Sequence, residues 1–151
     1  MLKASESHTL SLIVRTAARS VARLMFLFGF YIVFHGQITH GDGFAGGVIM
    51  ALGFILLMIV FGREVSMEII SRSGARCLAG LGALLLLMIG AGGLSGSGYF
   101  FFNFLGKGTP FHYWSAGIIP LCNFAVLLIV TGVLVGVFAA LTSFEMKAGR
   151  K

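Results

Sequence analysis

Four long apolar stretches constrain the fold of this chain more than any other feature. They run from about Ser20 to Gly36, Phe44 to Gly62, Cys77 to Leu94 and Trp114 to Leu141. Each is close to or above the ~17 to 25 residues with which an α-helix crosses a hydrocarbon core. With 58% hydrophobic and 11% charged residues, the 151-residue chain has too much apolar surface for a water-soluble domain. We therefore predict an all-α integral membrane protein, with four transmembrane helices in a single domain, residues 1–151.

The basic residues predict the orientation of these helices. All eleven lysines and arginines except Lys107 lie before or near the start of the first stretch, follow the fourth, or join the second to the third. Because positive charge collects on the cytoplasmic side, we expect both termini in the cytoplasm. The net charge of +6 then reflects topology and anionic lipid. Nucleic acid is not an expected partner, because no basic stripe is interleaved with stacking aromatics. No small-residue cleavage site follows the first stretch, so we expect no cleaved signal peptide.

The segment that leads into the first apolar stretch is basic. Arg15, Arg19 and Arg23 recur at four-residue spacing, which predicts a short interfacial N-terminal helix continuing into the first span. Between Arg23 and the next polar residues, the apolar run Leu24–Phe34 is only about 16 Å of helix, roughly half of the core. Either the first helix begins well before Arg23, or the turn that follows dips below the headgroups. Both alternatives suggest a partner or a water-filled pocket.

A glycine-rich turn, "HGQITHGDGFAGG", follows from His35 to Gly47. Its glycines permit a tight turn and a close approach of neighbouring backbone. Asp42 is well placed to cap the second helix. Alternatively, His35 and His40 beside this carboxylate could handle protons near neutral pH. Three donors within eight residues of a turn are not a recognised zinc spacing, and no two histidines face inward from two spans to ligate haem. We therefore expect no cofactor.

The fourth apolar stretch contains the sequence "SAGIIPLCNFAV", Ser115 to Val126. Pro120 cannot donate to the carbonyl of Ala116, so we expect a kink that leaves this carbonyl open to water, Asn123 or an ion. Ordinary helix packing is the alternative. All acidic residues fall at or beyond the ends of the spans, and this argues against a stand-alone carrier, which needs ionisable groups near the bilayer centre.

Glycines at four-residue spacing and a cluster of aromatics predict surfaces for neighbouring helices or subunits. The glycine pairs match the small-xxx-small pattern that lets membrane helices approach closely. The connection after the third stretch is rich in aromatic residues between Tyr99 and Trp114, typical of an interfacial belt or a docking surface. The pairs are Gly43 with Gly47, Gly92 with Gly96, and Gly132 with Gly136.

The glycine-rich turn resembles the signature of the MnhB family, the B subunits of Mrp-type multisubunit sodium/proton antiporters. That signature runs approximately as glycine, histidine, two variable residues, proline, three glycines, phenylalanine, one variable residue and two glycines. The "SAGIIPLCNFAV" segment is similar to a glycine, proline and asparagine segment of the same family. In this chain Gln37, His40 and Asp42 depart from the pattern. The matching positions are Gly36, Gly41, Gly43, Phe44, Gly46 and Gly47.

The resemblance implies a small subunit that works with other membrane subunits in a prokaryotic inner membrane, with no catalytic site of its own. The assembly would be a sodium/proton antiporter or the homologous module of a membrane-bound hydrogenase-like complex, with sodium ions and protons as its ligands. A purely structural assembly subunit is the alternative. For an ion path or interface the expected residues are His35, His40, Asp42, Phe44, Pro120 and Asn123. For the turn and helix packing they are Gly36, Gly41, Gly43, Gly46, Gly47, Gly132 and Gly136.

Overall fold

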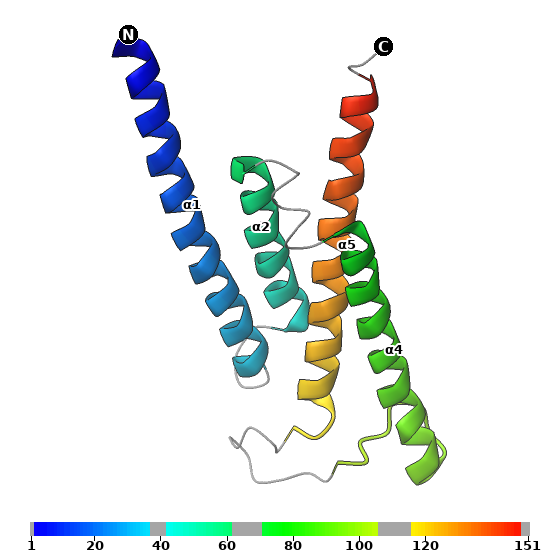
Figure 1. The fold of residues 1–151 in the computed structure, drawn as a ribbon. Coiled ribbons are helices and arrows are strands. Elements are labelled where there is room, and N and C mark those ends of the chain that lie inside the picture. Colours follow the sequence, from blue (N-terminus) through cyan, green and yellow to red (C-terminus); the bar gives the residue numbers. More distant parts are fainter. Residues whose placement is uncertain (1, 37–41, 62–70, 106–115, 149–151) are drawn as a thin grey trace.

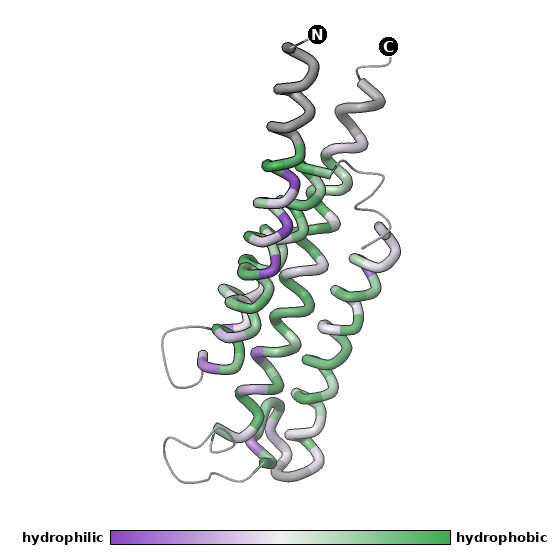
Figure 2. Tube along the Cα trace, turned by 60° about the vertical axis from the view of Figure 1, so that its left-hand side comes forward, coloured by the Kyte–Doolittle hydropathy of each residue, from purple (hydrophilic) through white to green (hydrophobic). Residues whose placement is uncertain are grey.

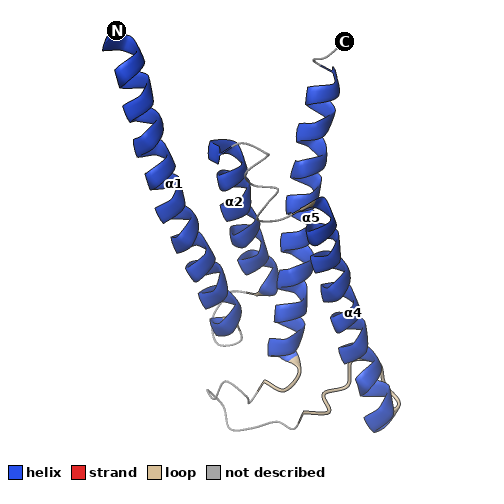
Figure 3. Cartoon of the chain, in the orientation of Figure 1, coloured by secondary structure: helices blue, strands red, loops and turns tan. Residues whose placement is uncertain are grey.

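Four α-helices make up the part of the chain that the structure, a computed structural model, describes: residues 2–36, 42–61, 71–105 and 116–148. Within these ranges there is no strand (Figure 3). Each helix contains a segment long and apolar enough to cross a membrane. The predicted all-α architecture with four spanning helices is therefore confirmed, and the chain is a multi-pass membrane protein. The helices are α1 (Leu2–His35), α2 (Gly43–Phe61), α4 (Arg72–Ser97) and α5 (Ile119–Ala148).

The first helix is much longer than the predicted first span. It runs without interruption from Leu2 to His35, and its membrane-spanning segment is Leu12–His35. The basic segment is therefore the first part of the spanning helix itself. Of the two alternatives for the short apolar run, the chain adopts the one in which the helix begins well before Arg23.

The last helix begins later than predicted. Trp114 lies outside the described residues, and α5 begins at Ile119, after a turn formed by residues 116–118. Within this turn Gly117 has a φ of 64°, in the left-handed region that a right-handed helix cannot continue through. The turn therefore fixes the start of α5. At the other end the helix continues past Leu141 to Ala148.

The helices lie side by side in the order α1, α2, α5, α4, so that α5 lies between α2 and α4 (Figure 1). The N-terminus of α1 and the C-terminus of α5 lie at the same end of the molecule. Most residues of the described helices are hydrophobic, and the most regular hydrophilic bands lie along the middle of α1 (Figure 2). Large apolar side chains are exposed on every helix, as expected for a surface that faces lipid or other subunits.

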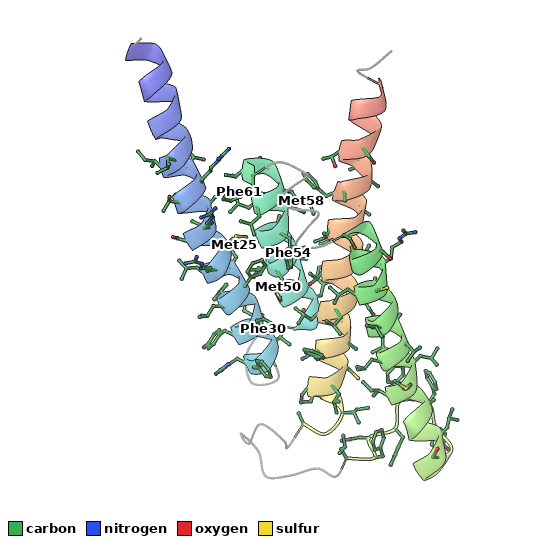
Figure 4. The ribbon with its side chains drawn as sticks, in the orientation of Figure 1. Met25, Phe30, Met50, Phe54, Met58 and Phe61 are labelled. Atoms are coloured by element: carbon green, nitrogen blue, oxygen red, sulfur yellow. The ribbon has the colours of Figure 1, made fainter. Side chains whose placement is uncertain are left out.

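The contact between α1 and α2 combines methionine and phenylalanine side chains with closely spaced glycines. Phe26 packs against Phe54 with their ring centroids 4.7 Å apart. Figure 4 shows the neighbouring Met25 and Met50 between the same two helices. At Gly29 a Cβ would lie 3.1 Å from the carbonyl oxygen of Gly46, so the two backbones nearly touch. Only glycine permits this distance between helices.

The contact between α4 and α5 also depends on glycine. A Cβ on Gly132 would lie 2.6 Å from both the carbonyl oxygen of Ala75 and the amide nitrogen of Ala79, so the two helices approach closely at this glycine. Gly136 is less constrained, because a Cβ there would be an ordinary 3.9 Å from Ala75. Gly92 meets the ring of Phe104 in the loop after α4 rather than another helix.

Candidate functional site

The glycine-rich turn ends at a helix cap. The side-chain Oδ1 of Asp42 accepts a hydrogen bond of 3.0 Å from the backbone N–H of Ala45, and its carbonyl accepts one of 3.2 Å from Gly46. A carboxylate at this position satisfies a backbone donor in the first turn of α2 and interacts favourably with the helix dipole. The predicted cap is confirmed. Asp42 is also exposed, so its charge faces outward from the helix end.

The first residue of α2 lies directly on the backbone of α5. A Cβ on Gly43 would overlap the carbonyl oxygen of Asn123 and lie 2.7 Å from its carbonyl carbon. Because any larger residue would push the helices apart, glycine at this position holds the Asp42 end of α2 against the start of α5. The two segments that carry the family resemblance are thus in contact within one chain, although 80 residues separate Gly43 from Asn123 in the sequence.

One helical turn further along, the same contact continues into the membrane. A Cβ on Gly47 would lie 3.1 Å from the carbonyl oxygen of Leu127 and 2.8 Å from the Cβ of Val130. The hydroxyl of Thr131 donates a 3.2 Å hydrogen bond to the carbonyl of Gly47, and Thr131 is only 2% exposed. Such a hydrogen bond in an apolar interior orients the two helices relative to each other. We call the contacts of Gly43 and Gly47 with α5, from Asn123 to Thr131, the α2–α5 seam.

The spacing of the motif glycines follows from two neighbours on adjacent faces of α2. Gly43 and Gly47 face α5, while Gly46 faces α1, where a Cβ would overlap Val33 and lie 2.9 Å from the carbonyl oxygen of Gly29. At 3.6 residues per turn, Gly47 lies almost directly above Gly43 on one face, while its neighbour Gly46 lies on an adjoining face. The sequence "GFAGG" therefore lets α2 approach α1 and α5 at the same level.

Pro120 does not break a helix. It is the second residue of α5, where its missing N–H costs no helical hydrogen bond. The carbonyl of Ala116 accepts a hydrogen bond of 3.4 Å from the N–H of Ile119, and that of Ile118 accepts one of 3.0 Å from Cys122. The predicted kink, with the Ala116 carbonyl left open to an ion, was wrong because the turn at Gly117 places the proline at a helix start rather than inside a helix.

The histidines are only partly covered by the structure. His35 ends α1 and stacks on Tyr31, with ring centroids 4.1 Å apart, and Gly36 follows it in a turn. His40 and Gly41 lie outside the described residues, so the predicted grouping of His35, His40 and Asp42 stays a prediction. The ring of Phe44 is exposed, available to lipid or to a neighbouring protein.

No three histidine, cysteine, aspartate or glutamate side chains cluster as metal ligands within the described ranges. The polar groups that the structure places at this end of the seam are the exposed side chain of Asp42, the residue Asn123 and backbone carbonyls.

The comparison with known families decides what kind of chain this is. Residues 13–136 match the model of a "domain related to MnhB subunit of Na+/H+ antiporter". The chain belongs to this MnhB-related family. Both the glycine-rich turn and the α5 segment lie inside the matched residues, so the seam is formed by the part of the chain that defines the family.

Individual relatives match this MnhB-family chain over only part of their own length. An uncharacterised protein of Methanocaldococcus jannaschii is 36% identical over 120 residues, which cover 76% of this chain and 45% of the relative. A protein of Staphylococcus aureus strain Newman, named "Putative antiporter subunit mnhB2", is 38% identical over 56 residues, covering 37% of this chain and 40% of the relative. The chain thus spans less than half of the length of these relatives.

Two residues that position the helices of this MnhB-family chain around the seam were not predicted from the sequence. Gly29 lies alone in an apolar run, and nothing marked it as the partner of Gly46 across the α1–α2 contact. Asn103 was also not predicted. Its side-chain amide lies so close to Gly117, just before the start of α5, that a Cβ on Gly117 would overlap it. The glycine in "SAGIIP" was a signal for a turn at this point.

Proposed function

We propose that the chain is a small membrane subunit of a multisubunit cation/proton antiporter, in which the outer end of the α2–α5 seam forms one wall of a hydrated ion path. Sodium is the cation that the family description suggests. The single observation that carries the proposal is the contact of Gly43 with Asn123, because it brings the family's two characteristic segments together beside the exposed carboxylate of Asp42.

The distribution of charge supports a shared rather than a self-contained path. Residues 43–61, 77–95 and 119–143 contain no aspartate, glutamate, lysine or arginine. Ion carriers need ionisable or strongly coordinating groups at membrane depth. In our proposal a neighbouring subunit supplies these groups, while Asp42 attracts cations to the outer mouth and Asn123 contributes polar atoms to its wall. His40, beside Asp42 in the sequence, is the proposed proton-handling residue of this mouth.

One finding favours a second candidate, a purely structural role in assembly. The cap by Asp42 and the Gly43–Asn123 contact both account for the motif residues without any ion. The two candidates differ in what the charge of Asp42 does. Asparagine also caps helices well, so Asp42→Asn removes the charge while keeping an acceptor for the Ala45 N–H.

The test is sodium-dependent proton movement across everted membrane vesicles that contain the whole assembly. We expect Asp42→Asn to lower this activity while the subunits still co-purify, with Glu145→Gln near the end of α5 as a control that removes one carboxylate elsewhere. Unchanged transport in Asp42→Asn would contradict the ion-path proposal and favour the assembly role. Loss of co-purification in the same variant would also count against it, because the charge would then act through structure.

A further inference from the structure

Three arginines form a row along one side of α1. Arg15, Arg19 and Arg23 occupy successive turns of the helix, about 6 Å apart along its axis, and all three are exposed. The row lies in the middle of α1, beside the last residue of α2. Nothing in the seam or in the proposed ion path uses these residues.

The position of Arg19 fixes the depth of the row. Its guanidinium carbon lies 4.8 Å from the centroid of the Phe61 ring, and Phe61 is the last residue of α2 (Figure 4). The 19 uncharged residues of α2 span about 28 Å, nearly the ~30 Å of a hydrocarbon core. Phe61 therefore marks the edge of the core. Arg15 then lies one turn outside this edge, and Arg23 one turn inside it.

A charge at the depth of Arg23 requires an anionic partner or access to the headgroups. Among the side chains that the structure describes, Asp42 is the one carboxylate, and it lies at the opposite end of α2. The side chains that follow the row on the same helix are apolar and open to the surroundings: Leu24 is 65% exposed, Leu27 69% and Phe28 52%. The partner must therefore combine negative charge at the membrane edge with hydrocarbon below it.

We propose that this row is a binding site for an anionic phospholipid. Its phosphate accepts hydrogen bonds from the guanidinium groups, which match phosphate oxygens in a two-pronged geometry. Its acyl chains lie along Leu24, Leu27 and Phe28. Along the helix the site is first positively charged and then apolar. An anionic lipid has the matching order, a negatively charged headgroup followed by acyl chains. The proposal is independent of ion transport, and its test does not require an active assembly.

The experiment measures binding of phosphatidylglycerol and of phosphatidylcholine to the purified full chain, or to the assembly in which it purifies, by native mass spectrometry from detergent micelles. We expect saturable binding of phosphatidylglycerol and little of phosphatidylcholine. The test variant is Arg15→Gln with Arg23→Gln, which leaves the Arg19–Phe61 contact in place. At the usual contribution of one basic residue near an anionic surface, removing two should weaken binding about 30-fold.

The matched control removes two positive charges at the same end of the molecule, by Arg76→Gln with Lys147→Gln. Retained binding in this control, together with loss in the test variant, supports a site at the row. Equal loss in both variants would show attraction to overall charge and overturn the proposal. Equal binding of both lipids by the unaltered chain would overturn it as well, whatever the variants do, since the row would then not distinguish an anionic headgroup from a zwitterionic one.

Discussion

The hydroxyl of Thr131 on α5 donates a buried 3.2 Å hydrogen bond to the carbonyl of Gly47 on α2. Thr131 is the one buried polar side chain among the described residues. Its bond lies on the seam one turn beyond the Gly43–Asn123 contact, so it supports the same arrangement of helices that holds Asp42 at the start of α2. A side chain deep in the membrane thus helps to position a carboxylate at its edge.

Thr131→Val should lower the free energy of unfolding in detergent by roughly 0.6 to 1 kcal/mol, because the shape is kept while a hydrogen bond between helices is lost. Thermal unfolding followed by circular dichroism measures this. Thr142→Val is the matched control, since the hydroxyl of Thr142 bonds to Phe138 in its own helix. Equal effects of the two variants would contradict a specific role for the Thr131 bond.

Gly43→Ala should disrupt the seam, because the added methyl group would overlap the carbonyl of Asn123. Overpacking of this kind costs about 1 to 3 kcal/mol, and we expect reduced yield of the folded chain by size-exclusion chromatography. Gly80→Ala on α4 is the control, since a methyl group there meets nothing within 4 Å. Its effect should be neutral or slightly stabilising, as alanine favours helix. A Gly43→Ala chain that behaves like Gly80→Ala would show that the seam is looser than described.

Asp42→Ala should destabilise the chain by about 1 kcal/mol, because the Ala45 N–H loses its acceptor at the start of α2. Asp42→Asn should retain most of the stability, since asparagine supplies an equivalent oxygen. Chemical unfolding of the two variants side by side measures the difference. If asparagine is as damaging as alanine, the carboxylate charge rather than the cap contributes the stability.

Phe61→Leu should lower stability by about 0.5 to 1 kcal/mol through loss of the contact between its ring and Arg19. Phe34→Leu, at an exposed position near the other end of the membrane, makes the same chemical change without such a contact. The melting temperatures of the two variants in the same detergent give the comparison. A drop confined to Phe34→Leu would contradict the Arg19–Phe61 pairing.

The sequence predicted the four spans and the cap at Asp42 because both depend on local properties: hydropathy over a window, and a side chain next to the backbone it serves. It also predicted a basic helix that continues into the first span, but it did not predict the first residue of α1, because hydropathy carries no information about helix ends outside the hydrocarbon core. The error at Pro120 has a similar cause. Whether a proline kinks a helix or starts one depends on where the helix begins, and the left-handed Gly117 decides that here.

Partners across helices were harder to predict than helix ends. Gly43 and Gly47 could be recognised as a packing pair, but their contact with Asn123 and Leu127 depends on which helix lies beside α2. Gly29 gave no signal at all, because a single glycine in an apolar run also occurs on lipid-facing surfaces. The resemblance to a family connected the turn with the α5 segment, and the structure supplied the physical contact between them.

The helices occur along the chain in the order α1, α2, α4, α5, yet α5 lies between α2 and α4 (Figure 1). During synthesis, the glycine faces of α2 and α4 that meet α5 must therefore remain uncovered until the final helix enters the bilayer. Contacts between distant parts of a chain form only after both parts exist. A chain cut short before Ile119 would leave the ribosome without the helix that joins α2 to α4.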